Sequence, residues 1–97
     1  MNARVVTVQS KPDKVEEAVS LWRDEVLPIA KQQQGFKGVL LLLDRGTGKT
    51  ISISLWESEA DMKAGESSGY FQAQLAKFVP LFAGQPAREH YEVGLQA

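Results

Sequence analysis

Apolar residues near the start of the chain change from the spacing of a strand to the spacing of a helix. Residues 3–9 are rich in valine, which is typical of a β-strand. From Val15 to Ile29 the apolar residues recur every three or four positions, so they share one face of a helix. Pro28 lacks an N–H group and its ring crowds the carbonyl four residues back, so we expect a kink near the helix end. Gly35 is expected to be a left-handed C-terminal cap.

The rest of the chain is predicted to form a hairpin, two helices and a final strand. A short glycine-rich connection between two β-like runs is typical of a hairpin, and helical spacing of aromatic and leucine residues follows it. In chain order the segments are strands 36–44 and 49–57, helices 58–65 and 69–83, and a strand at 88–95. This order predicts an α+β fold of the ferredoxin-like βαββαβ type, with a four-stranded antiparallel sheet and the helices on one face.

The strand at 36–44 is apolar on both of its faces. Val39 to Leu43 form an unbroken apolar run, whereas a sheet with one solvated face alternates apolar and polar residues. Helices can cover only one face, and each Leu or Val left in water forfeits about 1.5–3 kcal/mol. We therefore expect a homodimer in which two sheets pack face to face. The alternative is that a loop or the C-terminal tail covers the second face.

Composition and charge narrow the class of protein. With 97 residues, 43% hydrophobic and 24% charged, the chain is expected to form a single domain over residues 1–97. A net charge of −1 argues against a nucleic-acid partner, and no apolar run approaches the ~20 residues that span a membrane. The N-terminus lacks the pattern of a secretory leader, so we expect a cytoplasmic protein. Because the chain has no cysteine and one histidine, we expect no metal site.

The third predicted strand carries the first candidate for a binding site. Thr50, Ser52, Ser54 and Trp56 alternate with apolar residues and therefore share one face of the strand. A row of hydroxyl groups ending in an indole is suited to a small polar pocket beneath the helices. A partly hydrated dimer interface, or simple tolerance of Ser and Thr in a strand, would produce the same pattern. Trp22 on the first helix would offer a flat ligand a stacking surface, although such a residue is more often part of a core.

His90 and the segment at 46–50 each allow a functional and a purely structural interpretation. Histidine is the residue type best suited to acid–base chemistry near neutral pH, so His90 is the natural general base if the chain has one. A lone histidine with Arg88 and Glu92 on the same strand face is more often an exposed or salt-bridged residue. The segment at 46–50 invites comparison with a phosphate-binding loop, but Leu43 stands where that motif needs a glycine and a strand follows instead of a helix. We interpret this segment as a hairpin turn.

Several segments resemble the antibiotic-biosynthesis-monooxygenase (ABM) domain. They are the late Pro28 of the first helix, residues 35–38 before the second strand, residues 55–60 at the end of the third, and Tyr70-Phe71 with residues 80–82 in the last helix. The resemblance implies a dimeric α+β barrel with a cavity between sheet and helices in each subunit. Members of this family include cofactor-independent monooxygenases of polycyclic aromatic polyketides, haem-degrading enzymes, and isomerases of small phosphorylated sugars or ketones. Fold alone does not choose among these activities.

The chain departs from the haem-degrading members of that family. Those members resemble one another in a Trp and a His that fall at Gly65 and Leu75 here, and in an Asn on the first strand that is missing beyond Asn2. A leucine cannot ligate iron, so we expect no haem and, by the resemblance, no metal or flavin cofactor.

The leading hypothesis is a cofactor-independent monooxygenase that acts on a small aromatic or quinol-type substrate. In this interpretation His90 is the base and Tyr70 a hydrogen-bond donor, and the substrate-binding residues are Trp56, Trp22, Ser54 and Ser52. The alternative is a non-catalytic dimer of the same fold that binds a small molecule or takes part in a stress response.

Overall fold

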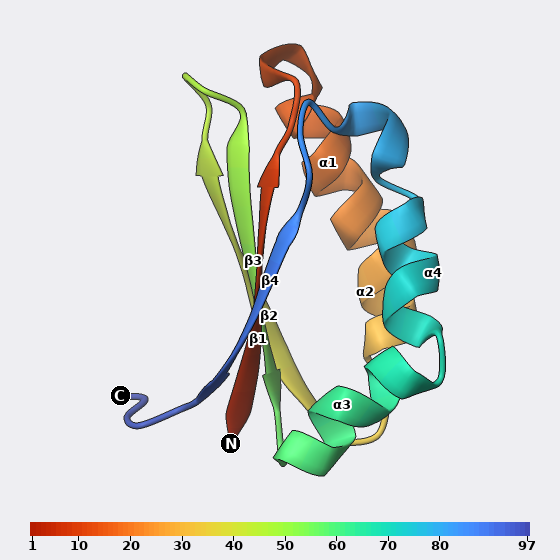
Figure 1. Cartoon of the computed structure of the whole chain (residues 1–97), viewed down its shortest axis with the longest axis vertical. Helices are drawn as coiled ribbons and strands as arrows, with labels where there is room; N and C mark the ends of the chain where they lie inside the picture. The colour runs from red at the N-terminus through yellow and green to blue at the C-terminus, as the bar shows by residue number, and fades with distance from the viewer.

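The computed structural model describes all residues from 1 to 97 and has two layers, a sheet and a layer of helices (Figure 1). The sheet is antiparallel throughout and its strand order is β2-β3-β1-β4. The strands are β1 (Asn2–Gln9), β2 (Phe36–Asp44), β3 (Lys49–Trp56) and β4 (Ala87–Glu92). All helices lie on one face of the sheet. The predicted ferredoxin-like α+β fold is confirmed.

Strand register places the polar residues of three strands on the helix-facing side. β1 is central, and its Arg4 lies opposite Ser54 of β3 on one side and opposite His90 of β4 on the other. Directly opposed residues of antiparallel strands point to the same face. Residues from opposite ends of the chain therefore meet beneath the helices.

The first helical segment is interrupted as Pro28 predicts. It consists of a 3-10 turn at Pro12–Lys14, α1 (Val15–Leu21), a π-helical turn at Trp22–Val26, and α2 (Leu27–Ala30). At the π turn the Leu27 N–H donates to the carbonyl of Trp22, five residues back. A π turn widens the helix next to a proline that cannot continue the normal hydrogen-bond ladder. Gly35 has the predicted left-handed conformation, with a φ of 81°, but it does not cap the helix, because α2 ends at Ala30 and Gly35 lies in the turn that leads into β2.

The second half of the chain departs from prediction in one helix and in the last strand, since the strand predicted for 88–95 ends at Glu92. The β2–β3 hairpin and α3 (Glu59–Ser67) lie where expected, and the Ser58 hydroxyl caps α3 by accepting from the Asp61 N–H at 3.1 Å. The single helix predicted for 69–83 is wrong in its length. It ends as α4 (Tyr70–Ala76), and a 3-10 turn follows at Val79–Leu81. Pro80 explains the break, because a proline disfavours helical geometry in the residue before it.

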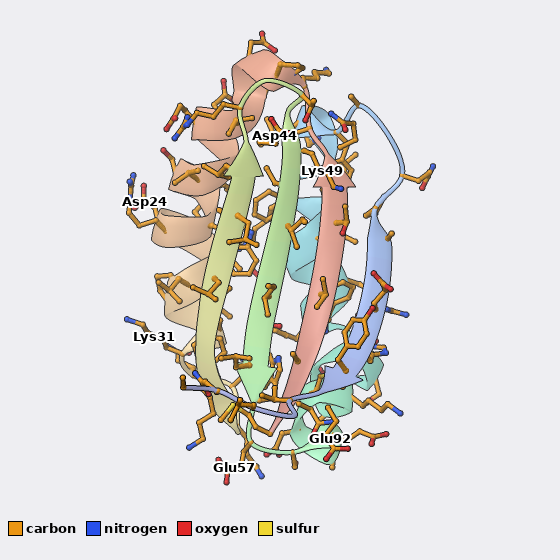
Figure 2. All side chains as sticks on the ribbon, turned by 90° about the vertical axis from the view of Figure 1, so that its left-hand side faces the viewer. Asp24, Lys31, Asp44, Lys49, Glu57 and Glu92 are labelled. Carbon is orange, nitrogen blue, oxygen red and sulfur yellow. The ribbon has the colours of Figure 1, made fainter.

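The core lies between the layers, while the other face of the sheet stays partly open. Trp56, Val26 and Met62 are each 1% exposed beneath the helices. On the outer face Leu40 is 58% and Leu42 is 47% exposed. Figure 2 looks onto this face and shows the C-terminal tail crossing one end of it, so the tail covers only part of the sheet. None of the helices has the length and apolarity needed to cross a membrane.

Candidate functional site

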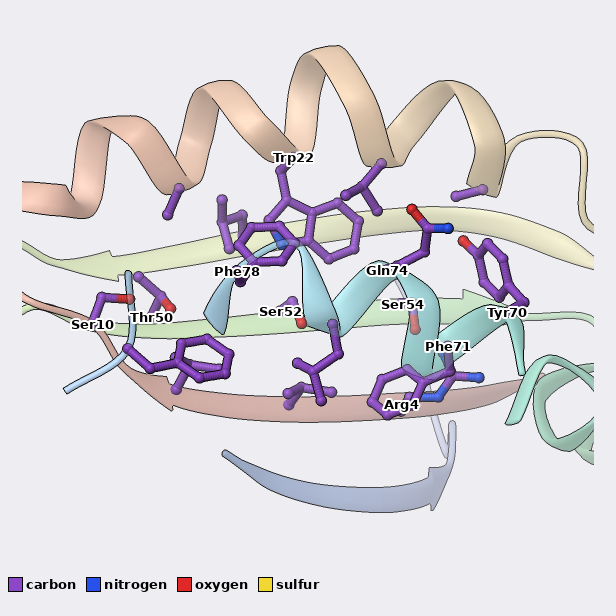
Figure 3. A pocket seen from close by; sticks show the side chains of 18 of the residues that line it. Arg4, Ser10, Trp22, Thr50, Ser52, Ser54, Tyr70, Phe71, Gln74 and Phe78 are labelled. Carbon is purple, nitrogen blue, oxygen red and sulfur yellow. The ribbon is translucent and has the colours of Figure 1, made fainter. Parts of the chain in front are cut away.

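A cavity lies between the helix-facing side of the sheet and the helices (Figure 3). Its wall is mostly apolar and aromatic, and its volume is about 70 Å³. β1 and β3 form its floor, and the long first helical segment and α4 form its roof. A partly enclosed, apolar space with a few polar groups is the usual form of a small-molecule site.

Five of the six residues predicted for the site line this cavity. They are Trp22, Ser52, Ser54, Trp56 and Tyr70. The period-two pattern of β3 therefore placed its hydroxyl row correctly, and Trp22 lies opposite it, with its ring 6.1 Å from that of Phe78. His90 is not part of the lining. It lies at the sheet edge on the same face, with 32% of its side chain exposed.

Trp56, at the end of β3, is part of the cavity wall. Its indole N–H donates to the Ser54 hydroxyl at 3.0 Å, and the ring of Phe36 meets it edge-on with a centroid distance of 5.5 Å. Because the Ser54 oxygen accepts from the indole, its own O–H remains able to donate toward a ligand. The indole is thereby held in one orientation beside a hydrogen-bond donor.

Arg4 is the functional side chain that sequence reasoning missed. Its guanidinium lies 4.6 Å from the ring centroid of Phe71 and 5.3 Å from that of Trp56. It donates to the carbonyl of Met62 at 2.7 Å and to Glu66 at 3.2 Å, and only 4% of the residue is exposed. Burial lowers the pKa of Arg4 and the contact with Glu66 partly offsets this effect, but an arginine stays protonated in proteins. It puts a fixed positive charge on the cavity wall.

Glu66, on α3, connects Arg4 to the sheet edge. Its carboxylate is 3.2 Å from Nε of Arg4, 3.1 Å from Nη1 of Arg88 and 2.7 Å from Nε2 of His90. Burial by itself would raise the pKa of Glu66, but hydrogen bonds from His90 and Arg4 and their charges outweigh it and lower the pKa. His90 is therefore a partly exposed residue paired with a carboxylate, as the plain interpretation of the sequence expects. Its partner is Glu66 of α3 and not Glu92 of its own strand. A catalytic role for His90 stays a prediction.

Tyr70, at the start of α4, is the second ionisable group on the wall. Burial raises its pKa, and the positive charge of Arg4 offsets part of that rise. The phenol therefore keeps its proton at neutral pH and can donate it in a hydrogen bond. In Figure 3 Tyr70, Ser54 and Arg4 lie toward the same end of the cavity, which makes that end the polar one.

This arrangement can bind and polarise a small organic molecule. Aromatic walls favour a flat ligand, and the hydrogen-bond donors and the positive charge at the polar end would stabilise negative charge that develops on a ligand oxygen. The structure brings together no group of three or more His, Cys, Asp or Glu residues that could hold a metal ion.

Comparisons with solved structures agree with this fold. A monooxygenase of Streptomyces coelicolor, solved in complex with the ligand nanaomycin D, is similar with a TM-score of 0.79 and 19% identity, over 99% of this chain and 90% of that one. A Nitrosomonas europaea protein of unknown function is similar with a TM-score of 0.77 and 20% identity, over 99% of this chain and 91% of that one. At these identities the likeness concerns the fold alone.

Comparisons of sequence identify the family. An uncharacterised protein of Mycobacterium tuberculosis is 33% identical over 92 residues, which are 94% of this chain and 40% of that protein. A second one from the same organism is 32% identical over 94 residues. The chain spans about two fifths of the length of these curated relatives. The profile of one family, described as antibiotic biosynthesis monooxygenase, matches residues 1–77, and the chain belongs to that family.

Proposed function

We propose that the cavity binds a small aromatic molecule of the phenol or quinol type and that the protein oxygenates it without a cofactor. The observation that carries the proposal is the pairing of aromatic walls with one polar end, where Tyr70, Ser54 and Arg4 gather. A planar ring fits the walls, and its oxygen fits the polar end. Membership of the family supports the reaction class.

The reaction needs no external reductant if the substrate supplies all the electrons. A phenol such as 1-naphthol reacts with dioxygen to give 1,4-naphthoquinone and water. One oxygen atom enters the ring and the other leaves as water, and the phenol O–H and the para C–H bonds are broken. The two hydrogens released from these bonds leave in the water. The protein's part is to bind the neutral phenol with its oxygen at the polar end, where Tyr70 donates a hydrogen bond and Arg4 stabilises the negative charge that develops on this oxygen during the reaction, and to exclude water from the carbanion-like ring.

The ionisable groups of the cavity also support the alternative that the protein binds a small molecule without catalysis. The ionisable residues of the lining are Arg4 and Tyr70, and both hold their protons at neutral pH. His90, the predicted base, would act on the cavity only through Glu66 and Arg4. If no base acts on the bound molecule, the same cavity binds a ligand without turning it over.

Oxygen consumption with 1-naphthol as the probe distinguishes the two functions. An oxygen electrode and detection of naphthoquinone measure turnover, and fluorescence of the two tryptophans, both on the cavity wall, measures binding. We expect turnover to fall at least tenfold in Tyr70→Phe and to stay unchanged in the control Tyr91→Phe, because Tyr91 lies on β4, is 50% exposed and does not line the cavity. Binding without oxygen uptake would favour the non-catalytic alternative. Absence of binding would refute the aromatic-ligand proposal.

We further propose that two copies of the chain pair through the outer faces of their sheets. Leu40 and Leu42 are about half exposed there, and Ile51, Ile53 and Leu55 of β3 share that face by register. Figure 2 shows the labelled charged residues Asp44, Lys49 and Glu92 at the ends of the strands that form this face. A continuous apolar face with a charged margin is suited to an isologous contact with a second copy.

A further inference from the structure

Gln74 is an unusual residue on the wall of the cavity. It lies on α4, four residues after Tyr70 and therefore on the same face of that helix, and both residues line the cavity. Figure 3 shows its amide directed into the space between the helices and the sheet. Its Oε1 atom is buried and has no hydrogen-bond partner, and no other buried side-chain oxygen or nitrogen in the chain lacks one.

An unpaired buried acceptor destabilises a folded protein, because the group loses its hydrogen bonds to water and gains none in return. The neighbouring cavity residues Phe71, Leu75 and Phe78 are apolar. A leucine or methionine would fill a similar volume at position 74 without leaving an acceptor unpaired. The amide is therefore unfavourable in the empty cavity and needs a partner that the chain does not supply.

We infer that Gln74 determines ligand specificity by accepting a hydrogen bond from an O–H group of the bound molecule. This inference rests on the proposed aromatic ligand and adds the chemistry that the cavity selects. A phenolic hydroxyl donates to Oε1, whereas the corresponding methyl ether has no proton to donate. A site built to pair with a hydroxyl rejects the analogue that lacks it, because the polar group of the site is then left unpaired.

Paired probes test this directly, with fluorine NMR titration as the measurement. 4-Fluorophenol and 4-fluoroanisole differ only in the donor proton and its methyl replacement. We expect the wild-type chain to bind the phenol more tightly, and Gln74→Leu to weaken phenol binding about five- to tenfold, the value of one neutral hydrogen bond. Binding of the anisole should change less than twofold. Gln72→Leu, on the exposed side of the same helix, is the matched control and should leave both affinities unchanged.

The melting temperature of the ligand-free protein is a second measurement, and it distinguishes a role of Gln74 in ligand binding from a role in stabilising the fold. Removing an unpaired acceptor should leave the melting temperature of Gln74→Leu equal to that of the wild type or above it. Gln74→Met offers the same test with an unbranched side chain if leucine does not fit. A glutamine that served only the fold would lower the melting temperature when replaced.

The outcomes separate this inference from the proposed function. Equal binding of phenol and anisole by the wild type, or an unchanged preference in both Gln74 variants, would overturn the role of Gln74 and leave the aromatic site standing. Binding of neither probe would overturn the aromatic-ligand proposal and the role of Gln74 with it.

Discussion

Replacing Glu66 with glutamine tests whether this carboxylate holds the charged wall of the cavity in place. The substitution keeps the size of the side chain and removes its charge. Arg4 is 4% exposed, and the side chain of Glu66 is 13% exposed, so water cannot replace the lost counter-charge. Arg88 and His90 also lose their anionic partner. The buried guanidinium would then lie beside further basic groups without compensation.

The expected cost follows from this burial. Breaking a buried ion pair by neutralising one partner costs about 3–5 kcal/mol. The amide oxygen that takes the place of the carboxylate in Glu66→Gln can still accept one hydrogen bond, so we expect a loss of about 3 kcal/mol, near the lower end. Domains of this kind have a total stability of about 5–15 kcal/mol, so the loss is easily measured.

Urea unfolding followed by tryptophan fluorescence is the assay, at one fixed protein concentration because association would add to stability. Glu59→Gln is the matched control, since Glu59 lies on the same helix and pairs with Lys63 at the surface, where both side chains are more than half exposed. We expect little change in that variant. If Glu66→Gln unfolded at the same urea concentration as Glu59→Gln, the ion-pair argument would be refuted.

The same carboxylate predicts a dependence of stability on pH. The pKa of Glu66 is lower in the folded protein than its ordinary value of 4.5. A group of this kind stabilises the fold at pH values above that ordinary value, which it has in the unfolded chain, and the contribution is lost as the pH falls through the folded-state pKa. When the pH is lowered from about 5 to about 3, the free energy of unfolding should therefore fall more in the wild type than in Glu66→Gln. Parallel curves for the two proteins would contradict the assignment.

The remaining predictions concern assembly and the hairpin. Leu42→Arg, on the outer face of the sheet, should convert the proposed dimer to monomers in analytical ultracentrifugation. Val79→Arg is the control and should leave the dimer intact, because Val79 is 58% exposed in the helical layer. A dimeric Leu42→Arg would exclude face-to-face pairing. Gly48→Ala should cost at least about 2 kcal/mol in urea unfolding, because Gly48 has a φ of 83° and a Cβ would lie 2.3 Å from the carbonyl oxygen of Ser10. Gly46→Ala in the same turn is the control, and equal losses in both would refute the steric argument.

Most of the fold could be predicted because its elements have local causes. The alternation in β3, the three-and-four spacing of the first helix and the glycines of the turns each act within a few residues. The prediction of one helix at 69–83 was wrong, and its cause is also local. Pro80 was visible in the sequence and should have ended the helix earlier.

The site was only partly predictable because its polar end depends on strand register. Nothing in the local pattern places Arg4 opposite Ser54 and His90, or brings Glu66 of α3 onto both basic residues. One indication was present. Arg4 is in phase with Val6 and Val8, which are buried, so a charge occurs on the inward-facing side of a valine-rich strand. A buried charge on such a face needs a partner, and this reasoning would have directed the search to an acidic residue under the helices.

Alternate residues of β3 belong to two different surfaces, the cavity and the proposed dimer interface. Thr50, Ser52, Ser54 and Trp56 face the cavity, while the residues between them face outward. Because side chains alternate strictly along a strand, a slip of one residue in pairing would exchange the two surfaces. Trp56 opposes that slip, because the slip would turn this large side chain, which is 1% exposed, out of the core. Substitutions at even positions of β3 should therefore change ligand binding, and substitutions at odd positions should change self-association, which makes the two proposals separable by experiment.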